Sequence, residues 1–218
     1  MKRPRVLLAD DHPILTEGIE RILEPRFELI GAVQDGRALV REAERLDPDI
    51  VLVDISMPLL NGIDAARQLK KIEPRCKIVF LSMHADPDYV SEAFAAGASG
   101  YLLKSSFSSE LVFALEEVLK GRYYVAPAVA KDVVEAFASG PGDASRKGPP
   151  QPASKLTPRQ REVLQLVAEG KSVKEIACVL DVSVKTVEFH KTRIMEQLDL
   201  HSTAELTKYA VAHGLASL

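Results

Sequence analysis

Acidic, hydroxyl and amino side chains follow several apolar, strand-length runs in the first half of the chain. The first run is followed by Asp10 and Asp11, the third ends in Asp54, the fourth in Ser82 and the fifth in Lys104. Carboxylates gathered at one edge of a sheet repel one another, and they take up protons unless a cation neutralises them. Mg²⁺ is a hard divalent cation that prefers oxygen ligands, so the pattern predicts a magnesium site.

The same residue types suit the chemistry of a phosphoryl group. Asp54 offers a carboxylate nucleophile, Lys104 a positive point charge and Ser82 a hydroxyl donor to a phosphoryl oxygen. Simpler explanations exist for each: Asp54 as a turn residue, Asp10 and Asp11 as a helix N-cap, Ser82 and Lys104 as solvated surface. Because all five residues stand at predicted strand ends, the phosphoryl site is the favoured interpretation.

An alternating pattern of strands and helices positions these residues. Five runs are apolar at odd and even positions alike, as in parallel strands buried on both faces, and they span 5–10, 28–33, 49–54, 77–82 and 99–104. Amphipathic helical patterns follow them at 13–24, 36–46, 62–72, 87–96 and 108–120. This order predicts an α/β fold with a doubly wound, five-stranded parallel sheet, whose ligands bind at the carboxyl ends of the strands.

A segment poor in apolar residues separates the two halves of the chain. Residues 139–154 hold four of the thirteen prolines and three glycines, which predicts a flexible linker. Beyond it, the capping pattern Ser/Thr-x-x-Glu/Gln begins at Thr157, Ser172 and Ser202, and a further helix start follows Ser183. We therefore expect a small all-α domain with four helices, at about 158–169, 173–180, 184–198 and 203–213.

The second and third of these helices predict a helix-turn-helix, because only residues 181–183 separate them. In the third helix, Val187, Ile194 and Leu198 recur at helical spacing and should face the core, with His190 on the flank of that stripe. The side chains expected to point outward are those of Lys185, Glu188, Phe189 and Thr192. Such a stripe can contact DNA phosphates, cytosine and a thymine methyl group, although a solvated helix face is the alternative.

Composition restricts the class of protein. A net charge of −3 with 27% charged residues predicts neither a disordered chain nor a strongly basic one, so any nucleic-acid binding must be local. The two cysteines, Cys76 and Cys178, lie far apart, which excludes a disulfide framework and a cysteine-rich zinc site. With no apolar run near 18 residues and no signal-like N-terminus, we expect a cytoplasmic protein without a membrane partner.

The first half resembles the receiver domain of two-component response regulators over residues 1–124. The resemblance rests on the acid pair at 10–11, Asp54 with Met-Pro and Asn-Gly behind it, Ser82 and Lys104. It implies that a sensor histidine kinase phosphorylates Asp54.

The same resemblance assigns roles to the other residues of the predicted site. Asp11 and Asp54 would ligate Mg²⁺ together with the Ser56 carbonyl, and Asp10 would act mainly through water. Ser82 and Tyr101 match the family's switch pair, in which the hydroxyl moves toward the phosphoryl group while the ring turns inward. For Tyr101, plain core packing is the alternative.

The second half resembles the LuxR-type helix-turn-helix of the NarL/FixJ response regulators over residues 155–218. The LTPR opening and the TVEFH sequence carry this resemblance. It implies binding to double-stranded operator DNA through Lys174, Lys185, Thr186, Glu188, Phe189, Thr192 and Arg193. The last helix of this family commonly makes the dimer contact, which here would involve Leu206, Tyr209, Ala210 and His213, although simple core closure by these residues is the alternative.

Together these features predict a response regulator transcription factor: a flavodoxin-like receiver at 1–124, a helical extension and linker at 125–154, and a DNA-binding domain at 155–218. Phosphorylation is expected to produce a homodimer that binds DNA. One alternative is an enzyme, a Mg²⁺-dependent phosphatase or mutase, but that class wants a second acid where Ser56 stands. Another is a degenerate receiver that docks proteins without phosphorylation, which the complete acidic set disfavours.

Overall fold

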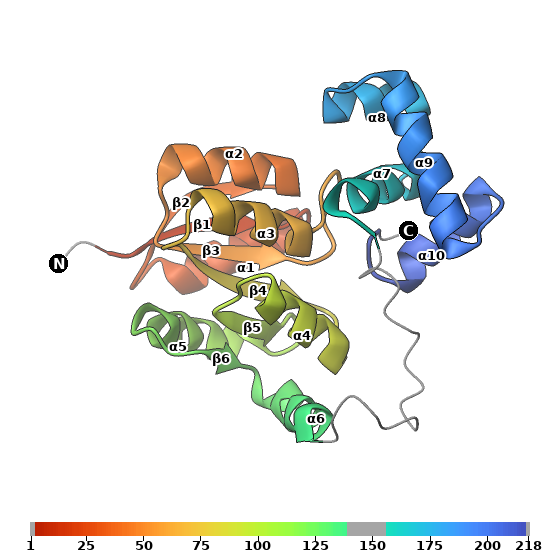
Figure 1. The fold of residues 1–218 in the computed structure, drawn as a ribbon. Helices are drawn as coiled ribbons and strands as arrows, with labels where there is room; N and C mark the ends of the chain where they lie inside the picture. The colour runs from red at the N-terminus through yellow and green to blue at the C-terminus, as the bar shows by residue number, and fades with distance from the viewer. Residues whose placement is uncertain (1–2, 139–155, 217–218) are drawn as a thin grey trace. The chain divides into compact units, whose positions relative to one another are not determined.

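The computed structural model describes residues 3–138 and 156–216, and in it the chain forms two compact units. The first unit holds the sheet and its helices, and the second holds four helices (Figure 1). Each unit has its own buried core. The predicted linker at 139–154 lies outside the described residues.

The first unit contains a parallel sheet with the strand order β2-β1-β3-β4-β5-β6. The strands are β1 (Arg5–Ala9), β2 (Glu28–Val33), β3 (Ile50–Asp54), β4 (Lys77–Ser82), β5 (Gly100–Leu103) and β6 (Tyr124–Val125). The helices between and after them are α1 (Pro13–Leu23), α2 (Gly36–Leu46), α3 (Gly62–Ile72), α4 (Pro87–Ala95), α5 (Phe107–Leu119) and α6 (Pro127–Ala138). The predicted doubly wound parallel sheet is confirmed, and the strand order reverses at β1, between β2 and β3.

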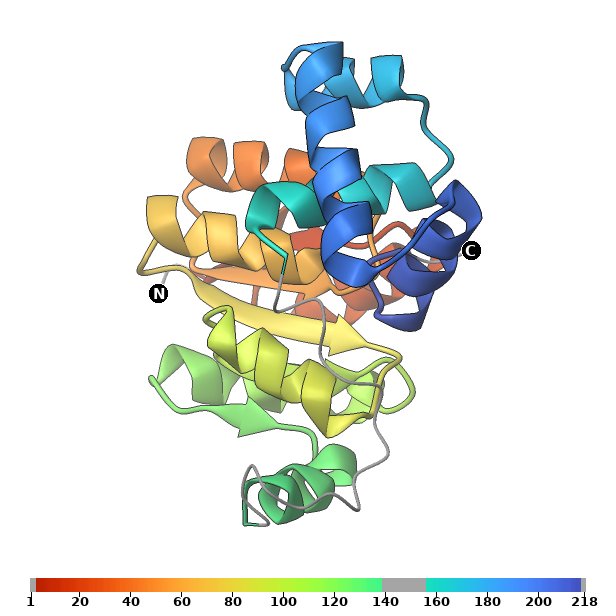
Figure 2. The same ribbon diagram turned by 45° about the vertical axis from the view of Figure 1, so that its right-hand side comes forward.

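Alternate side chains of each strand face opposite layers of helices. One parity packs against α1 and α5 in a single cluster that includes Leu8, Leu52 and Leu81 from the strands and Leu23 and Leu115 from the helices. The other parity, which includes Phe80 and Tyr101, is equally buried but does not belong to that cluster. Figure 2 shows α2, α3 and α4 as a second layer of helices against the sheet. Burial on both faces explains why the strands read as continuous apolar runs.

The sheet has six strands where the sequence predicted five. β6 comprises two residues, Tyr124 and Val125, that pair with Gly100 and Tyr101 of β5. Two residues are too few to produce a periodic pattern, so sequence periodicity does not detect this strand.

The second unit contains α7 (Pro158–Ala168), α8 (Val173–Leu180), α9 (Val184–Leu198) and α10 (Thr203–Ala212). All three predicted capping boxes are present, at Thr157, Ser172 and Ser202, with both reciprocal hydrogen bonds formed in each. The turn between α8 and α9 is the predicted three-residue segment, with Asp181 in the left-handed conformation at φ 51° and Ser183 capping α9. Among the described residues, no helix is both long and apolar enough to cross a membrane.

Candidate functional sites

The carboxyl ends of neighbouring strands bring the predicted acidic residues together. β1 and β3 are adjacent, Asp10 directly follows β1, and Asp54 is the last residue of β3. One carboxylate oxygen from each of Asp10, Asp11 and Asp54 lies within 4.8 Å of the others, together with a ring nitrogen of His12. The predicted clustering of the three carboxylates at one edge of the sheet is therefore confirmed, and we call this edge the rim.

Lys104 pairs with two of these carboxylates. Its Nζ lies 2.7 Å from Asp10 Oδ2 and 2.8 Å from Asp54 Oδ2, and the lysine side chain is 8% exposed. Burial lowers the pKa of Lys104, but its hydrogen bonds to Asp10 and Asp54 outweigh this, and the pKa is raised above its ordinary value. Lys104 is thus held as a fixed positive charge between two buried carboxylates.

The Asp54 carboxyl is buried at 4% exposure. Burial raises its pKa above the ordinary value, and the contacts with Lys104, which lower the pKa, do not cancel the rise. The nearby charge of Asp10 adds to the increase. A further cation at this rim would favour the ionised, nucleophilic form of Asp54.

A close backbone approach shapes the loop that follows Asp54. The Ser56 N–H donates to Asp54 Oδ1 at 3.4 Å, and the Gly62 N–H donates to the Ile55 carbonyl at 2.8 Å. A Cβ at Gly62 would lie 1.9 Å from the Asp54 carbonyl oxygen, which no side chain allows. Glycine is therefore required where α3 begins beside the predicted phosphoacceptor.

Ser82 is the last residue of β4 and Tyr101 the second residue of β5, and both side chains contact His84 in the loop that follows β4. Ser82 is fully buried and its Oγ accepts a hydrogen bond from the His84 N–H at 3.0 Å, while the Tyr101 hydroxyl donates to the His84 carbonyl at 2.8 Å. Burial raises the pKa of Tyr101 to about 12, although a hydrogen bond with Ser82 lowers it. The His84 ring stacks on Tyr89 of α4, with ring centroids 4.2 Å apart. Both predicted switch residues therefore form hydrogen bonds with the backbone of His84.

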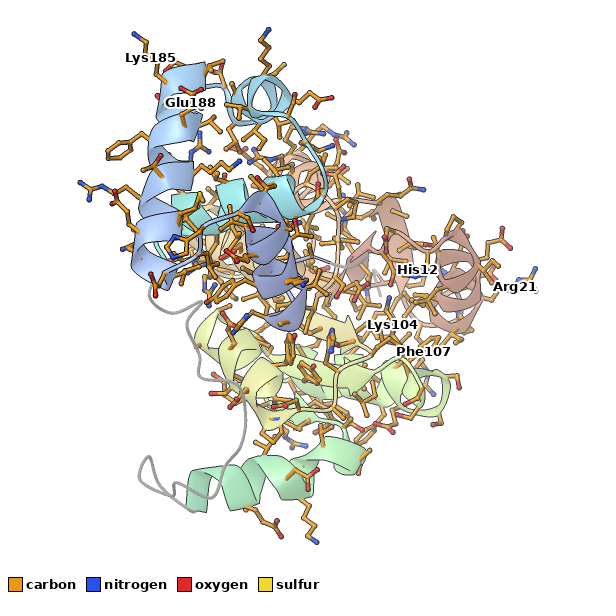
Figure 3. All side chains as sticks on the ribbon, turned by 90° about the vertical axis from the view of Figure 1, so that its right-hand side faces the viewer. His12, Arg21, Lys104, Phe107, Lys185 and Glu188 are labelled. Carbon is orange, nitrogen blue, oxygen red and sulfur yellow. The ribbon has the colours of Figure 1, made fainter. Side chains whose placement is uncertain are left out.

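His12 is a member of the cluster that the sequence argument missed. Its Nδ1 lies 3.0 Å from Asp10 Oδ1 and 2.9 Å from Asp11 Oδ1, and its backbone N–H donates to Asp10 Oδ1. His12, and neither aspartate, is the N-cap of α1, and it makes no side-chain capping bond. The N-cap alternative for Asp10 and Asp11 is therefore wrong. A histidine directly after an acid pair at a strand end was the available signal. Figure 3 labels His12 and Lys104.

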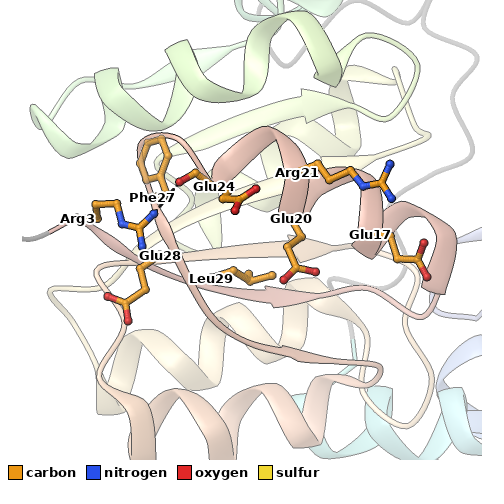
Figure 4. Close-up of a pocket in the computed structure, with 8 residues that line it drawn as sticks. All are labelled: Arg3, Glu17, Glu20, Arg21, Glu24, Phe27, Glu28 and Leu29. Atoms are coloured by element: carbon orange, nitrogen blue, oxygen red, sulfur yellow. Dashed lines mark hydrogen bonds between the residues drawn. The ribbon is translucent and has the colours of Figure 1, made fainter.

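A surface pocket of about 390 Å³ lies elsewhere on the first unit, where α1 meets β2 (Figure 4). Charged side chains dominate its lining, which includes Glu17, Glu20, Glu24, Glu28, Arg3 and Arg21. None of the predicted site residues lines it. The acidic rim, and not this pocket, is the candidate for phosphoryl chemistry.

The two faces of α9 are sorted as the helical spacing predicted. Val187 and Ile194 are buried in the core of the second unit, and Leu198 packs against that core. The exposed side chains of α9 include those of Lys185, Glu188, Phe189, Thr192 and Arg193. Figure 3 shows Lys185 and Glu188 projecting from the beginning of this helix.

Local contacts organise the exposed face of α9. The Arg193 guanidinium lies 5.6 Å from the centroid of the Phe189 ring and forms an ion pair with Glu196 at 3.1 Å. Thr186 is partly buried, and its N–H donates to the Ser183 hydroxyl as part of the helix cap. Lys174 is exposed on α8. The face therefore presents cations, a carboxylate and an aromatic ring to solvent.

Two of the four predicted dimer contacts are core residues. Leu206 is 1% exposed and Ala210 is fully buried, and both belong to the core cluster of the second unit. The prediction is wrong for these two side chains, because α10 packs them against its own domain. Tyr209 and His213 are partly exposed and stack on each other, with ring centroids 4.0 Å apart.

Two family models match the chain. The model of the response regulator receiver domain matches residues 6–116, and that of bacterial regulatory proteins of the luxR family matches residues 154–210. The transcriptional regulatory protein MctR of Rhizobium johnstonii is 35% identical over 215 residues, which cover 98% of this chain and 95% of that protein. The oxygen regulatory protein NreC of Staphylococcus carnosus is also 35% identical, over 97% of this chain and 98% of that protein.

Solved structures also match this chain over nearly its whole length. The RcsB response regulator of Salmonella typhimurium has a TM-score of 0.64 and 29% identity, and the match covers 98% of this chain and 99% of that one. A structure of RcsB bound to promoter DNA in the presence of a phosphomimetic has a TM-score of 0.59 and 29% identity, over 97% and 99% of the two chains.

Proposed function

Because the chain belongs to the response regulators that join a receiver domain to a LuxR-type helix-turn-helix domain, we propose that phosphorylation of Asp54 controls its binding to operator DNA. The relatives are regulators of transcription and not enzymes. The observation that carries the proposal is Asp54 itself, a buried carboxylate whose Oδ2 lies 2.8 Å from Lys104 Nζ at the rim of the sheet.

The phosphoryl donor is a phosphohistidine of a sensor histidine kinase. An oxygen of Asp54 attacks phosphorus, the P–N bond breaks as the P–O bond forms, and the kinase imidazole leaves with the electron pair of the broken bond. Lys104 offsets the charge that gathers at the rim, and Ser82 donates its hydroxyl hydrogen to a phosphoryl oxygen.

Mg²⁺ is the proposed cofactor. Asp11, Asp54 and the Ser56 carbonyl would hold it, with Asp10 contributing mainly through water. The donor set fits this ion, because the acidic side chains gather within 4.8 Å and supply hard oxygen ligands. When bound, Mg²⁺ would neutralise charge on the phosphoryl oxygens. The pKa of Asp54 is raised above its ordinary value even though Lys104 contacts the carboxyl group. Ionised Asp54 would therefore be stabilised by a positive charge additional to that of Lys104.

The DNA-binding surface is proposed to comprise Lys174, Lys185, Thr186, Glu188, Phe189, Thr192 and Arg193. Lysines and Arg193 would contact phosphates, and Glu188 would accept from a cytosine amino group.

Domain limits of 1–124, 125–154 and 155–218 remain part of the proposal, as does a phosphorylation-dependent homodimer with Tyr209 and His213 at the contact. The second unit carries nine Lys and Arg against eight Asp and Glu over 155–218, a net charge of +1. Because this charge is small, pairing of two subunits would strengthen binding.

The decisive test uses the full chain with a small phosphodonor such as acetyl phosphate. With Mg²⁺, intact mass should show one phosphoryl group that hydroxylamine removes, and EDTA should prevent its addition. Asp54→Asn should abolish labelling, whereas Asp88→Asn, which changes an exposed carboxylate of α4, should not. Labelling of the Asp54→Asn protein at the level of the unchanged chain would show that the nucleophile is another residue.

A linked measurement addresses DNA binding. A selection from random DNA pools with the phosphorylated full chain identifies the preferred site. Phosphorylation should then increase affinity for that site, and the Asp54→Asn chain should show no increase. An equal affinity of all forms would leave the receiver without control over DNA binding.

A further inference from the structure

His12 adds a nitrogen donor to an otherwise oxygen-lined rim. Its Nδ1 faces the carboxylates of Asp10 and Asp11 at 3.0 and 2.9 Å, and the imidazole is 65% exposed. Asp11 Oδ1 is shielded from solvent and accepts no hydrogen bond from the rest of the described chain. His12 Nδ1 and Asp11 Oδ1 are therefore in direct contact, and either an Nδ1–H that donates to the carboxylate or a shared cation lies between them.

The spacing of these atoms matches that of ligands around one ion. In an octahedral complex with metal–ligand bonds of about 2.1 Å, neighbouring ligand atoms are about 3.0 Å apart. The distance from His12 Nδ1 to Asp11 Oδ1, the proposed direct ligand, is 2.9 Å. The backbone N–H of His12 donates to Asp10 Oδ1 at 2.9 Å. The position of this oxygen therefore does not depend on the imidazole alone.

Ligand type then determines which ion gains most. Mg²⁺ takes oxygen ligands and retains water, whereas imidazole nitrogen suits ions such as Co²⁺, Ni²⁺ and Zn²⁺. A site made of carboxylates alone binds Co²⁺, Ni²⁺ and Zn²⁺ through oxygen. A site that also includes an imidazole gains affinity for these three ions without a comparable gain for Mg²⁺.

We propose that His12 Nδ1 is a metal ligand beside Asp11, and that it shifts the selectivity of the receiver site from Mg²⁺ toward imidazole-binding transition ions. The inference rests on the proposed cation site. It concerns which ion occupies the rim, and phosphorylation of Asp54 does not depend on it.

The test measures the affinity of the full chain for Mg²⁺ and for Co²⁺ by calorimetry, with no phosphodonor present. His12→Asn should weaken Co²⁺ binding at least about tenfold, because even groups that only support a metal ligand typically change affinity by about 10–100-fold. Mg²⁺ affinity should change by less than about threefold. The visible absorption of bound Co²⁺ should also change, because an oxygen or water ligand replaces nitrogen.

Two control variants separate the possible outcomes. His201→Asn replaces an 81% exposed histidine of the second unit and should change neither affinity. Asp11→Asn should weaken binding of both ions. If Asp11→Asn weakens both ions but His12→Asn leaves the ratio of Co²⁺ to Mg²⁺ affinity unchanged, His12 is not a ligand, its contact with Asp11 is only a hydrogen bond, and the proposed function stands. If the unchanged chain binds neither ion, the inference and the proposed Mg²⁺ site both fail.

Discussion

The two units expose their proposed functional residues to opposite degrees. In the first unit, Asp54 is 4% exposed, and Ser82 and Tyr101 are fully buried. In the second unit, Lys185 and Glu188 are exposed and Phe189 is 57% exposed. The difference agrees with the two proposed tasks, because a small phosphoryl group would enter a site at the edge of the sheet whereas DNA would have to meet side chains that extend from a helix.

This difference decides what a substitution does. Charges at the receiver rim are desolvated and must be balanced within the protein, so their removal changes the free energy of unfolding. Exposed side chains of α9 contribute little to folding, so their removal should change DNA binding and leave stability within about 0.5 kcal/mol. Substitutions at the two sets of residues therefore test this separation.

Lys104→Met should strongly destabilise the receiver in EDTA. Loss of the lysine leaves Asp10 and Asp54 buried without their cation, and breaking such a buried pair typically costs about 3–5 kcal/mol. Urea unfolding of the full chain measures this loss of stability. Tyrosine fluorescence monitors the first unit, because four of the five tyrosines lie there. Mg²⁺ should recover part of the loss.

The matched control is Lys120→Met. Lys120 pairs with Glu117 at 2.9 Å but is 56% exposed, so its removal should cost less than about 1 kcal/mol. Equal effects of the two substitutions would contradict the view that burial gives the rim charges their weight.

Glu188→Ala should change sequence preference without changing stability. If Glu188 accepts from cytosine, its loss should relax the preference at one base pair by about 1–3 kcal/mol. Selection from random DNA pools with the unchanged and variant chains provides the measurement. An unchanged preferred motif would exclude base contact by this side chain.

Lys185→Ala is the comparison for this prediction, because it is exposed on the same helix but is expected to contact phosphate. It should weaken binding to all sequences alike and make the dependence of log K on log salt shallower by about one unit. A loss confined to the preferred sequence would assign Lys185 to base reading instead.

The smallest expected effect is a pH dependence that comes from Asp54. Because the folded-state pKa of this carboxyl is raised above its ordinary value of 3.8, protonated Asp54 favours the folded state. This stability is fully present below pH 3.8 and is lost as pH rises through the raised pKa. In EDTA, the melting temperature of Asp54→Asn relative to the unchanged chain should therefore increase from acidic to neutral pH. A relative decrease over this interval would contradict the direction of the shift.

Most of the fold could be predicted from sequence, because its signals are local. The limits of β2, β4, α2, α3, α8 and α9 match the predicted ranges, since strands buried on both faces read as apolar runs and capping residues mark helix starts. The rim residues could be predicted for a related reason: parallel strands bring their carboxyl ends to one edge.

What could not be predicted depends on contacts between distant or very short segments. The side-chain direction of His12 is set by Asp10 and Asp11 in space, and no periodicity encodes it. In α10, Leu206 and Ala210 satisfy both a dimer pattern and a core pattern, and only packing within the domain separates the two. The partnership of Ser82 and Tyr101 with one loop residue, His84, likewise depends on backbone atoms.

The close approach at Gly62 has a consequence for how this sequence can vary. Its α-carbon lies so near Asp54 that any added carbon would displace the Asp54 carbonyl and, with it, the end of β3. A saturation library selected for phosphorylation should therefore be as depleted of variants at Gly62 as at Asp54 itself. Gly62 contributes no atom to the chemistry, so mutational intolerance alone would mislead an observer into counting it among the reacting groups.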